Sequence, residues 1–195
     1  MKTIIAVTFF GILTYTSAET IQYGKGSCQT VKGMKNFDAA QFFSGPWSLT
    51  HATPSARVTK STICRDYALS TGNDGKLFGT YGYYENGASG NYYDIHCSGS
   101  KSTTKEDLYG FDCELTNARG EKTHTHIDAY FIATDYTNYG LIYRCVKSDT
   151  QFEDNVFVIY RNKNPSDDKV KEILSPYGLD LGKFISRKEA TCTTK

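Results

Sequence analysis

The chain has 195 residues, with 22 Lys and Arg against 21 Asp and Glu, and its first eighteen residues have the features of a secretory signal peptide. Removing residues 1–18, whose one charged side chain is Lys2, leaves 177 residues with 21 basic and 21 acidic side chains. This balance argues against a nucleic-acid or anionic-membrane partner held by bulk charge. No later run approaches the ~20 apolar residues of a membrane span. We therefore expect a secreted, soluble single domain over residues 19–195.

The sequence predicts a helical turn, then a series of strands, then a helix. Residues 36–43 are expected to form one turn whose phenylalanines face inward as a plug. Runs rich in aromatic and β-branched residues, separated by Gly and Asn turn signals, are predicted strands: 47–52, 76–84, 91–97, 108–115, 124–134, 140–146 and 156–161. A helix over 167–174 follows, with Asp167 and Asp168 in its first turn, where the helix dipole favours negative charge. The pattern is typical of an all-β meander or barrel.

Three short motifs sharpen this prediction. They are Gly45-Pro46-Trp47, Thr134-Asp135-Tyr136 and Arg161. In type, order and spacing they resemble the motifs of lipocalins. The resemblance implies an eight-stranded antiparallel up-and-down barrel with an N-terminal plug turn and a C-terminal α-helix. It also implies that Arg161 packs over Trp47 and closes the base of the barrel.

Two further segments narrow the resemblance. Residues 183–189 precede the last cysteine, and residues 75–77 precede a tyrosine-rich strand. Both are similar to segments of the salivary lipocalins of blood-feeding triatomine bugs, of the triabin, pallidipin and triplatin type, which are related to the nitrophorins. The likeness extends over essentially the whole mature chain. It implies a salivary protein that impairs haemostasis.

Six cysteines in a chain bound for an oxidising compartment indicate a disulfide framework. Fifteen pairings are possible from the sequence alone. The resemblance implies that Cys28 pairs with Cys145 and Cys64 with Cys192. Cys97 and Cys113 are then the remaining pair.

Haem is the cofactor that the resemblance makes it necessary to consider. The nitrophorins bind haem through a histidine on the strand after a Gly-Lys-Leu segment, and the matching position here is Tyr83. An imidazole is the usual ligand of such a haem, and nothing in the sequence calls for a tyrosinate. We expect no haem and no other cofactor.

Alternation along the strands predicts which side chains line the barrel, because successive residues face opposite sides. If Tyr83 faces inward, Tyr81 does so too. Candidate ligand-binding residues on this basis are Tyr81, Tyr83, His126, Asp128, Tyr130, Ile142 and Arg144. Arg144 has two interpretations. It is either a structural charge, paired with Asp128 or placed at the outer rim, or a clamp for the carboxylate or phosphate of a ligand.

The sequence offers little for a metal site or for catalysis. His124 and His126 share one face of a predicted strand, and a metal site would need His51 or His96 in addition. Exposed strand histidines are the simpler interpretation, and we expect no metal. The chain has no Gly-x-Ser-x-Gly and no metalloprotease helix, and no cysteine is free if all six pair. We therefore expect a binding protein and not an enzyme.

Two classes of function stay open. In the first, the barrel sequesters a small host mediator and so inhibits platelet aggregation or vasoconstriction, with a thromboxane-like lipid favoured. An amine ligand would need a carboxylate, for which Asp128 is the candidate. In the second, the outer barrel face or loops such as 81–93 and 135–139 bind a coagulation protein, either thrombin or a contact-phase or kallikrein-kinin factor. A monomer is expected in both cases, and a housekeeping carrier is a weaker third choice.

Overall fold

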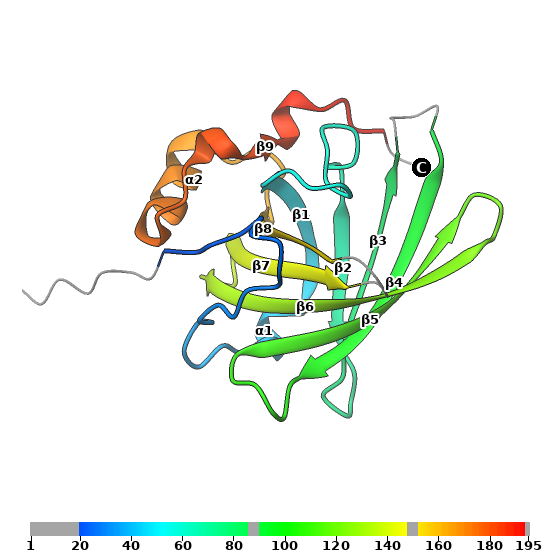
Figure 1. The fold of residues 1–195 in the computed structure, drawn as a ribbon, viewed down its shortest axis with the longest axis horizontal. Coiled ribbons are helices and arrows are strands. Elements are labelled where there is room, and N and C mark those ends of the chain that lie inside the picture. Colours follow the sequence, from blue (N-terminus) through cyan, green and yellow to red (C-terminus); the bar gives the residue numbers. More distant parts are fainter. Residues whose placement is uncertain (1–19, 86–89, 148–151, 194–195) are drawn as a thin grey trace, which may run out of the picture.

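Eight long antiparallel strands form the body of the protein, as a computed structural model shows for residues 20–85, 90–147 and 152–193 (Figure 1). They are β1 (Gly45–Ala52), β2 (Asp66–Thr71), β3 (Leu77–Tyr84), β4 (Tyr92–Lys101), β5 (Leu108–Asn117), β6 (Lys122–Thr134), β7 (Tyr139–Lys147) and β8 (Phe152–Tyr160). A two-residue strand, β9 (Ile185–Ser186), adds to the end of β1. The predicted signal peptide, residues 1–18, lies outside the described residues. No helix within the described ranges is long and apolar enough to cross a membrane.

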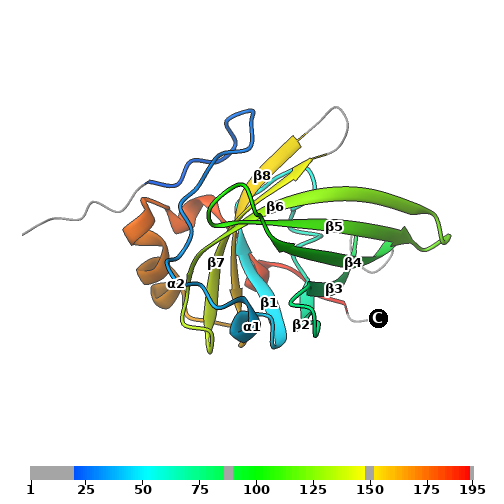
Figure 2. The ribbon, with the colours of Figure 1, turned by 90° about the horizontal axis from the view of Figure 1, so that it is seen from below.

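The sheet closes on itself. Each strand from β2 to β7 pairs with the next strand along the chain, and β1 pairs with both β8 and β2. The barrel therefore buries the edges that an open sheet would expose (Figure 2). The eight-stranded antiparallel up-and-down barrel implied by the lipocalin resemblance is confirmed.

One of the eight long strands, β2, was missed by the sequence analysis, as was the two-residue β9. The seven predicted strands correspond to β1 and to β3 through β8, whereas β2 was predicted as nothing. Only Tyr67 and Leu69 alternate toward the barrel interior in this six-residue strand, and its other positions are small or polar: Asp66, Ala68, Ser70 and Thr71. Two apolar side chains give only a weak signal of strand alternation. Arg65, two residues before Tyr67, lies on the same face.

A plug closes one end of the barrel. Helix α1 (Ala39–Phe42) is a single turn capped by Asp38, whose Oδ1 accepts a hydrogen bond from the Gln41 amide at 3.0 Å. Phe42 is buried and stacks on Trp47 with ring centroids 4.9 Å apart. The Trp47 indole N–H donates to the Phe42 carbonyl at 3.0 Å. The predicted inward-facing plug turn is confirmed, and it defines the closed end.

Arg161 ties this closed end together. Its guanidinium carbon lies 3.7 Å from the Trp47 ring centroid. Its Nη1 donates to the carbonyls of Ser44 and Pro46 at 2.6 and 2.8 Å, and its Nη2 donates to that of Tyr136 at 3.2 Å. One cation thus joins the start of β1 to the turn between β6 and β7. The role that the resemblance implied for Arg161 is confirmed.

The turn after β6 is built around Asp135. Its Oδ1 accepts hydrogen bonds from three amides, those of Thr137, Asn138 and Tyr139, at 3.1, 2.7 and 3.0 Å. Burial acts to raise the pKa of Asp135, but the Asn138 side-chain amide, which donates to Oδ2 at 2.7 Å, and the three backbone amides outweigh burial and lower the pKa. The Thr134 hydroxyl donates to the Tyr139 carbonyl and closes the turn. The Thr-Asp-Tyr motif is therefore a structural device that holds the Tyr136 carbonyl for Arg161.

A second apolar layer lies outside the barrel. Helix α2 (Asp167–Leu174) has the predicted bounds and buries Val170 and Leu174. These side chains pack with Ile21 of the N-terminal segment and Tyr143 of β7. Three short 3-10 turns, η2 (Ser175–Tyr177), η3 (Leu181–Lys183) and η4 (Arg187–Glu189), lead from α2 to the last cysteine.

The three disulfides join Cys28 to Cys145, Cys64 to Cys192 and Cys97 to Cys113. The pairing given in the sequence analysis is confirmed. The first two span 117 and 128 residues, so each stabilises the fold by about 5 kcal/mol in the chain-entropy model. The third staples facing positions of β4 and β5.

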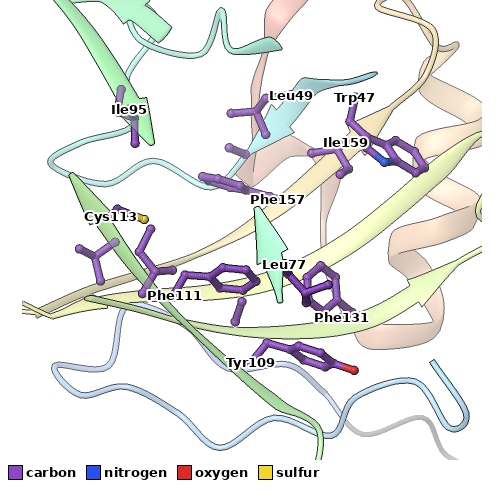
Figure 3. Packing of buried hydrophobic residues seen from close by; sticks show 14 of the residues in the cluster. Trp47, Leu49, Leu77, Ile95, Tyr109, Phe111, Cys113, Phe131, Phe157 and Ile159 are labelled. Carbon is purple, nitrogen blue, oxygen red and sulfur yellow. The ribbon is translucent and has the colours of Figure 1, made fainter. Parts of the chain in front are cut away.

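The main core fills the barrel itself. Trp47, Phe131 and Ile159 pack near the plug, whereas Leu49, Ile95 and Cys113 lie toward the other end (Figure 3). Phe111 and Phe157 point inward between them (Figure 3). Apolar packing is continuous from the plug upward, so a ligand inside the barrel would lie within this core.

Candidate ligand-binding cavity

A cavity of about 110 Å³ lies inside the barrel above the plug. Its lower wall is aromatic and aliphatic, and its upper wall carries hydroxyl and guanidinium groups. The lining side chains are Phe42, Phe43, Phe111, Phe131, Phe157, Leu69, Ile127, Ile142, Ile159, Tyr67, Tyr81 and Arg144, with Gly79, Cys97 and Ala129 between them. None of the described lining residues is acidic.

Arg144 points into this cavity. Its side chain comes from the middle of β7, and the residue is only 7% exposed. Nε donates to Asn155 Oδ1 at 3.1 Å, Nη2 donates to Glu153 Oε1 at 3.3 Å, and the guanidinium carbon lies 4.7 Å from the Phe157 ring centroid. Burial lowers the pKa of Arg144, and the nearby charge of Arg65 lowers it further. Arg144 is thus a buried cation at the boundary of the polar and apolar walls.

Arg65, which the sequence analysis did not select, is a second buried cation, 1% exposed. Nε donates to the Thr62 carbonyl at 2.9 Å, and Nη2 donates to the Arg57 carbonyl. Its guanidinium carbon lies 4.4 Å from the Tyr83 ring centroid. Burial acts to lower the pKa of Arg65, but the neighbouring tyrosines outweigh that effect and raise it. The charge is retained without a carboxylate among the described residues within salt-bridge distance.

Four tyrosines form a ladder beside Arg65. Ring centroids are 4.8 Å apart for Tyr67 and Tyr81, 6.4 Å for Tyr81 and Tyr83, and 5.5 Å for Tyr83 and Tyr93. Burial raises the pKa of Tyr67 to about 12, so its hydroxyl stays protonated and can donate to an anion. Tyr83, which the sequence analysis matched by resemblance to the haem-binding histidine of the nitrophorins, packs against the guanidinium of Arg65.

The charges of this site do not balance internally. Two guanidinium groups are buried here: that of Arg144 lines the cavity, and that of Arg65 packs against the rings of Tyr81 and Tyr83 without lining the cavity itself. Glu153, with a side chain 16% exposed, is the one carboxylate of the described residues within 4 Å of either. A low-dielectric wall with this excess of positive charge and with hydroxyl donors favours an anion over an amine.

Comparison with known proteins places the chain in a family. The family model named Triabin matches residues 18–174. The chain belongs to the triabin family. It is 28% identical over 193 residues to pallidipin of Meccus pallidipennis, covering 98% of each chain. It is 31% identical over 196 residues to triafestin-2 of Triatoma infestans, covering 97% of this chain and 92% of that one.

Solved structures agree with the triabin-family barrel. The tryptamine complex of the amine binding protein of Rhodnius prolixus matches with a TM-score of 0.69 and 21% identity, over 84% of this chain and 89% of that one. The LTC4 complex of LTBP1 matches with a TM-score of 0.52 and 31% identity, over 74% and 83%. The first likeness shows the fold alone.

Within this triabin-family barrel, the predicted lining is correct in part. Tyr81, Ile142 and Arg144 line the cavity, and Tyr83 faces the same interior one step farther from the plug. The inward placement of His126, Asp128 and Tyr130 is wrong, because β6 turns the other parity inward, and the cavity is lined by Ile127, Ala129 and Phe131. The inward set is wholly apolar, which explains the choice of face.

The three misassigned residues have structural roles on the outer face. Asp128 accepts a hydrogen bond from Lys147, and its Oδ1 lies 3.2 Å from His126 Nε2. Tyr130 belongs to the outer apolar layer, with its ring centroid 6.2 Å from that of Tyr143. Asp128 is therefore not available to an amine inside the barrel.

The remaining histidines also lie away from the cavity. His96, His124 and His126 line a shallow hollow of about 890 Å³ on the outer face of β4 to β6. Each faces a carboxylate, and the nearest pair joins His126 Nδ1 to Asp112 Oδ1 at 2.7 Å. No three His, Cys, Asp or Glu side chains of the described residues are grouped so as to hold a metal ion. His51 is buried separately, beneath the C-terminal segment.

Proposed function

We propose that this protein sequesters a small anionic lipid mediator of the host, with an oxygenated fatty acid of the thromboxane kind favoured, and so inhibits platelet aggregation or vasoconstriction. The observation that carries the proposal is a pair of buried arginines at an apolar cavity: Arg144 lines the cavity, and Arg65 packs on the lining residue Tyr81. Within the described residues, Glu153 is the one carboxylate within 4 Å of either guanidinium. A hydrocarbon chain suits the phenylalanine-rich lower wall. A carboxylate suits a guanidinium fork, and hydroxyl or oxo groups suit the tyrosine ladder.

Relatives support a lipid. The LTBP1 structures were solved with leukotriene C4, an anionic lipid, and are 31% and 30% identical to this chain. Platelet inhibitor triplatin-2 of Triatoma infestans is 29% identical over 193 residues, 98% of this chain and 100% of that one. These names concern the relatives, and they support an anti-haemostatic role of the same kind here. We infer a binding protein and not an enzyme.

An amine is the less favoured cargo. Amine-binding relatives share the fold at 21% identity, but an amine needs a carboxylate acceptor in the cavity. Asp128, the candidate acceptor, lies outside the barrel, and Glu153 is engaged by Arg144. An amine entering this site would meet two like charges.

Calorimetry with the secreted chain tests the proposal. A thromboxane analogue, arachidonate and leukotriene C4 would be titrated beside serotonin, histamine and ADP. We expect one anionic lipid to bind at a 1:1 ratio, and Arg144→Gln and Arg65→Gln to weaken binding at least tenfold, since a charge-assisted hydrogen bond is lost in each. Arg119→Gln, an exposed arginine in the turn between β5 and β6, is the matched control. Binding of an amine alone, or unchanged lipid affinity in both cavity variants, would refute the proposal.

The outer-face hollow favours one second candidate, a protein-binding inhibitor of coagulation. It is large, about 890 Å³, and its rim includes Phe78, one of the two exposed large apolar residues among those described. Clotting assays started by contact activation and by thrombin distinguish this function. Prolonged clotting without any small-ligand heat would favour it over lipid capture.

A further inference from the structure

The segment between β1 and β2, residues 53–65, closes the end of the barrel opposite the plug. We call it the mouth loop. Val58 and Ile63 are fully buried and belong to the same apolar cluster as Leu49 and Ile95 of the barrel wall. Beneath this loop the cavity measures only about 110 Å³, well under the ~300 Å³ at which ligand sites usually begin. A fatty acid therefore needs the mouth loop to move.

Glu153 joins the mouth loop to the cavity. Its Oε1 accepts hydrogen bonds from Arg144 Nη2 at 3.3 Å and from Ser55 Oγ at 3.4 Å. Its Oε2 accepts one from the Arg57 amide at 3.1 Å, and the Arg57 Nε lies 3.9 Å from Oε1. One carboxylate thus holds the buried cation of the cavity and two residues of the loop at the same time.

Asn155 reinforces this link, whereas Arg65, the last residue of the mouth loop, fixes the shape of the loop itself. Asn155 accepts from Arg144 Nε, and its Nδ2 donates to Ser55 Oγ at 3.4 Å. Arg65 donates to the carbonyls of Arg57 and Thr62, both within the mouth loop. Arg144, the cation that would receive a ligand anion, is therefore linked to Ser55 of the closed loop through both Glu153 and Asn155.

We propose that, in the ligand-free protein, the Glu153 carboxylate occupies the place at Arg144 that the anionic group of the ligand takes on binding. An entering carboxylate then replaces Glu153 at Arg144 and so releases the mouth loop. This inference rests on the proposed function. Exchanging one carboxylate for another leaves the charge around Arg144 unchanged, so the buried cation is never unpaired. The Glu153 side chain is already partly exposed and can turn to water. A neutral lipid or an amine cannot make the exchange, so the latch also selects for acids.

Hydrogen exchange and calorimetry on Glu153→Gln test the latch. Gln keeps the shape of Glu153 but not its charge, so we expect amide exchange of residues 53–63 in the ligand-free protein to rise about tenfold, because charge-assisted contacts to the loop are lost. We expect arachidonate affinity to rise several-fold, since Arg144 no longer has an internal competitor. Glu172→Gln, on the exposed side of α2, is the matched control and changes neither.

The outcomes separate the latch from the function on which it rests. In the wild-type protein, arachidonate is expected to increase loop exchange and arachidonate methyl ester to leave it unchanged. Binding of arachidonate with unaltered loop exchange, or equal or weaker binding by Glu153→Gln, would overturn the latch and leave lipid capture standing. Absence of arachidonate and thromboxane-analogue binding in every variant would overturn both. If Glu153→Gln does not fold, Glu153→Asp, whose shorter side chain cannot span Arg144 and Ser55, is expected to give the same loop exchange.

Discussion

The free energy of unfolding should fall at acidic pH because of His51. The barrel buries this histidine, and none of the described charged side chains is in contact with it. His51 is 2% exposed, and its Nδ1 lies 3.2 Å from the Thr50 hydroxyl. Burial lowers the pKa of His51 from 6.5 to about 4, and the opposing effect of Asp167 does not offset it. Lys188 adds to the lowering, and Glu189 opposes it. The folded protein thus keeps this imidazole neutral at pH values where the unfolded chain protonates it.

The sign and size follow from proton linkage. Because the folded pKa lies below the unfolded one, the neutral imidazole contributes its full stability above pH 6.5 and loses it as the pH falls toward 4. Between pH 7.5 and pH 5 the loss from this one group is about 2 kcal/mol. Asp66 and Asp135, whose pKa values are lowered from 3.8, keep their contribution throughout this range and lose it only at more acidic pH.

Urea unfolding followed by fluorescence measures this loss, because Trp47 is the single tryptophan and is fully buried. His51→Gln removes the titrating group, so its free energy of unfolding should fall by about 2 kcal/mol less than that of the wild type between pH 7.5 and pH 5. His124→Gln, whose parent side chain is 75% exposed, should keep the wild-type dependence. An unchanged pH dependence in His51→Gln would refute the reasoning.

Three further predictions concern the frame that carries the cavity. Arg161→Met should lower the free energy of unfolding by about 3 kcal/mol, since three carbonyls lose a charged donor and Trp47 loses its cation. A urea titration measures this loss. Lipid affinity should stay the same. Gly45→Ala should cost about 1 to 2 kcal/mol in the same assay, because Gly45 has φ +71°. Cys64→Ser with Cys192→Ser should cost about 2 to 5 kcal/mol, and a loss under 1 kcal/mol would contradict the chain-entropy account.

The frame of the barrel could be predicted because its signals are local. Asp135 organises a turn from its own three following amides, and Trp47 with Arg161 forms a motif whose parts are recognisable in the sequence. Strand periodicity located seven strands for the same reason. The disulfide pairing needed the family resemblance, since sequence spacing alone allows fifteen arrangements.

The candidate site could be predicted only in part, because strand alternation leaves two choices of face. For β6 one set is Ile127, Ala129 and Phe131, and the barrel takes this apolar set inward. The selection of His126 and Asp128 followed the other parity. A rule that the more apolar set faces a barrel interior would have corrected it.

Arg65 was missed for a different reason. It lies directly before β2, the strand with the weakest periodic signal, and its partners are backbone carbonyls and tyrosine faces. Every residue has a backbone carbonyl, so acceptors of this kind leave no recognisable pattern in a sequence. Only the alternation of Arg65, Tyr67 and Leu69 indicated an inward cation.

The central claim is that the two buried arginines receive the anionic group of a lipid. It is tested most directly by titrating the wild-type protein with a thromboxane-type acid and with the methyl ester of the same acid, which differ in charge and hardly in shape. The account predicts that the acid binds at a 1:1 ratio and that the ester binds at least tenfold more weakly. Equal affinity for acid and ester would contradict it.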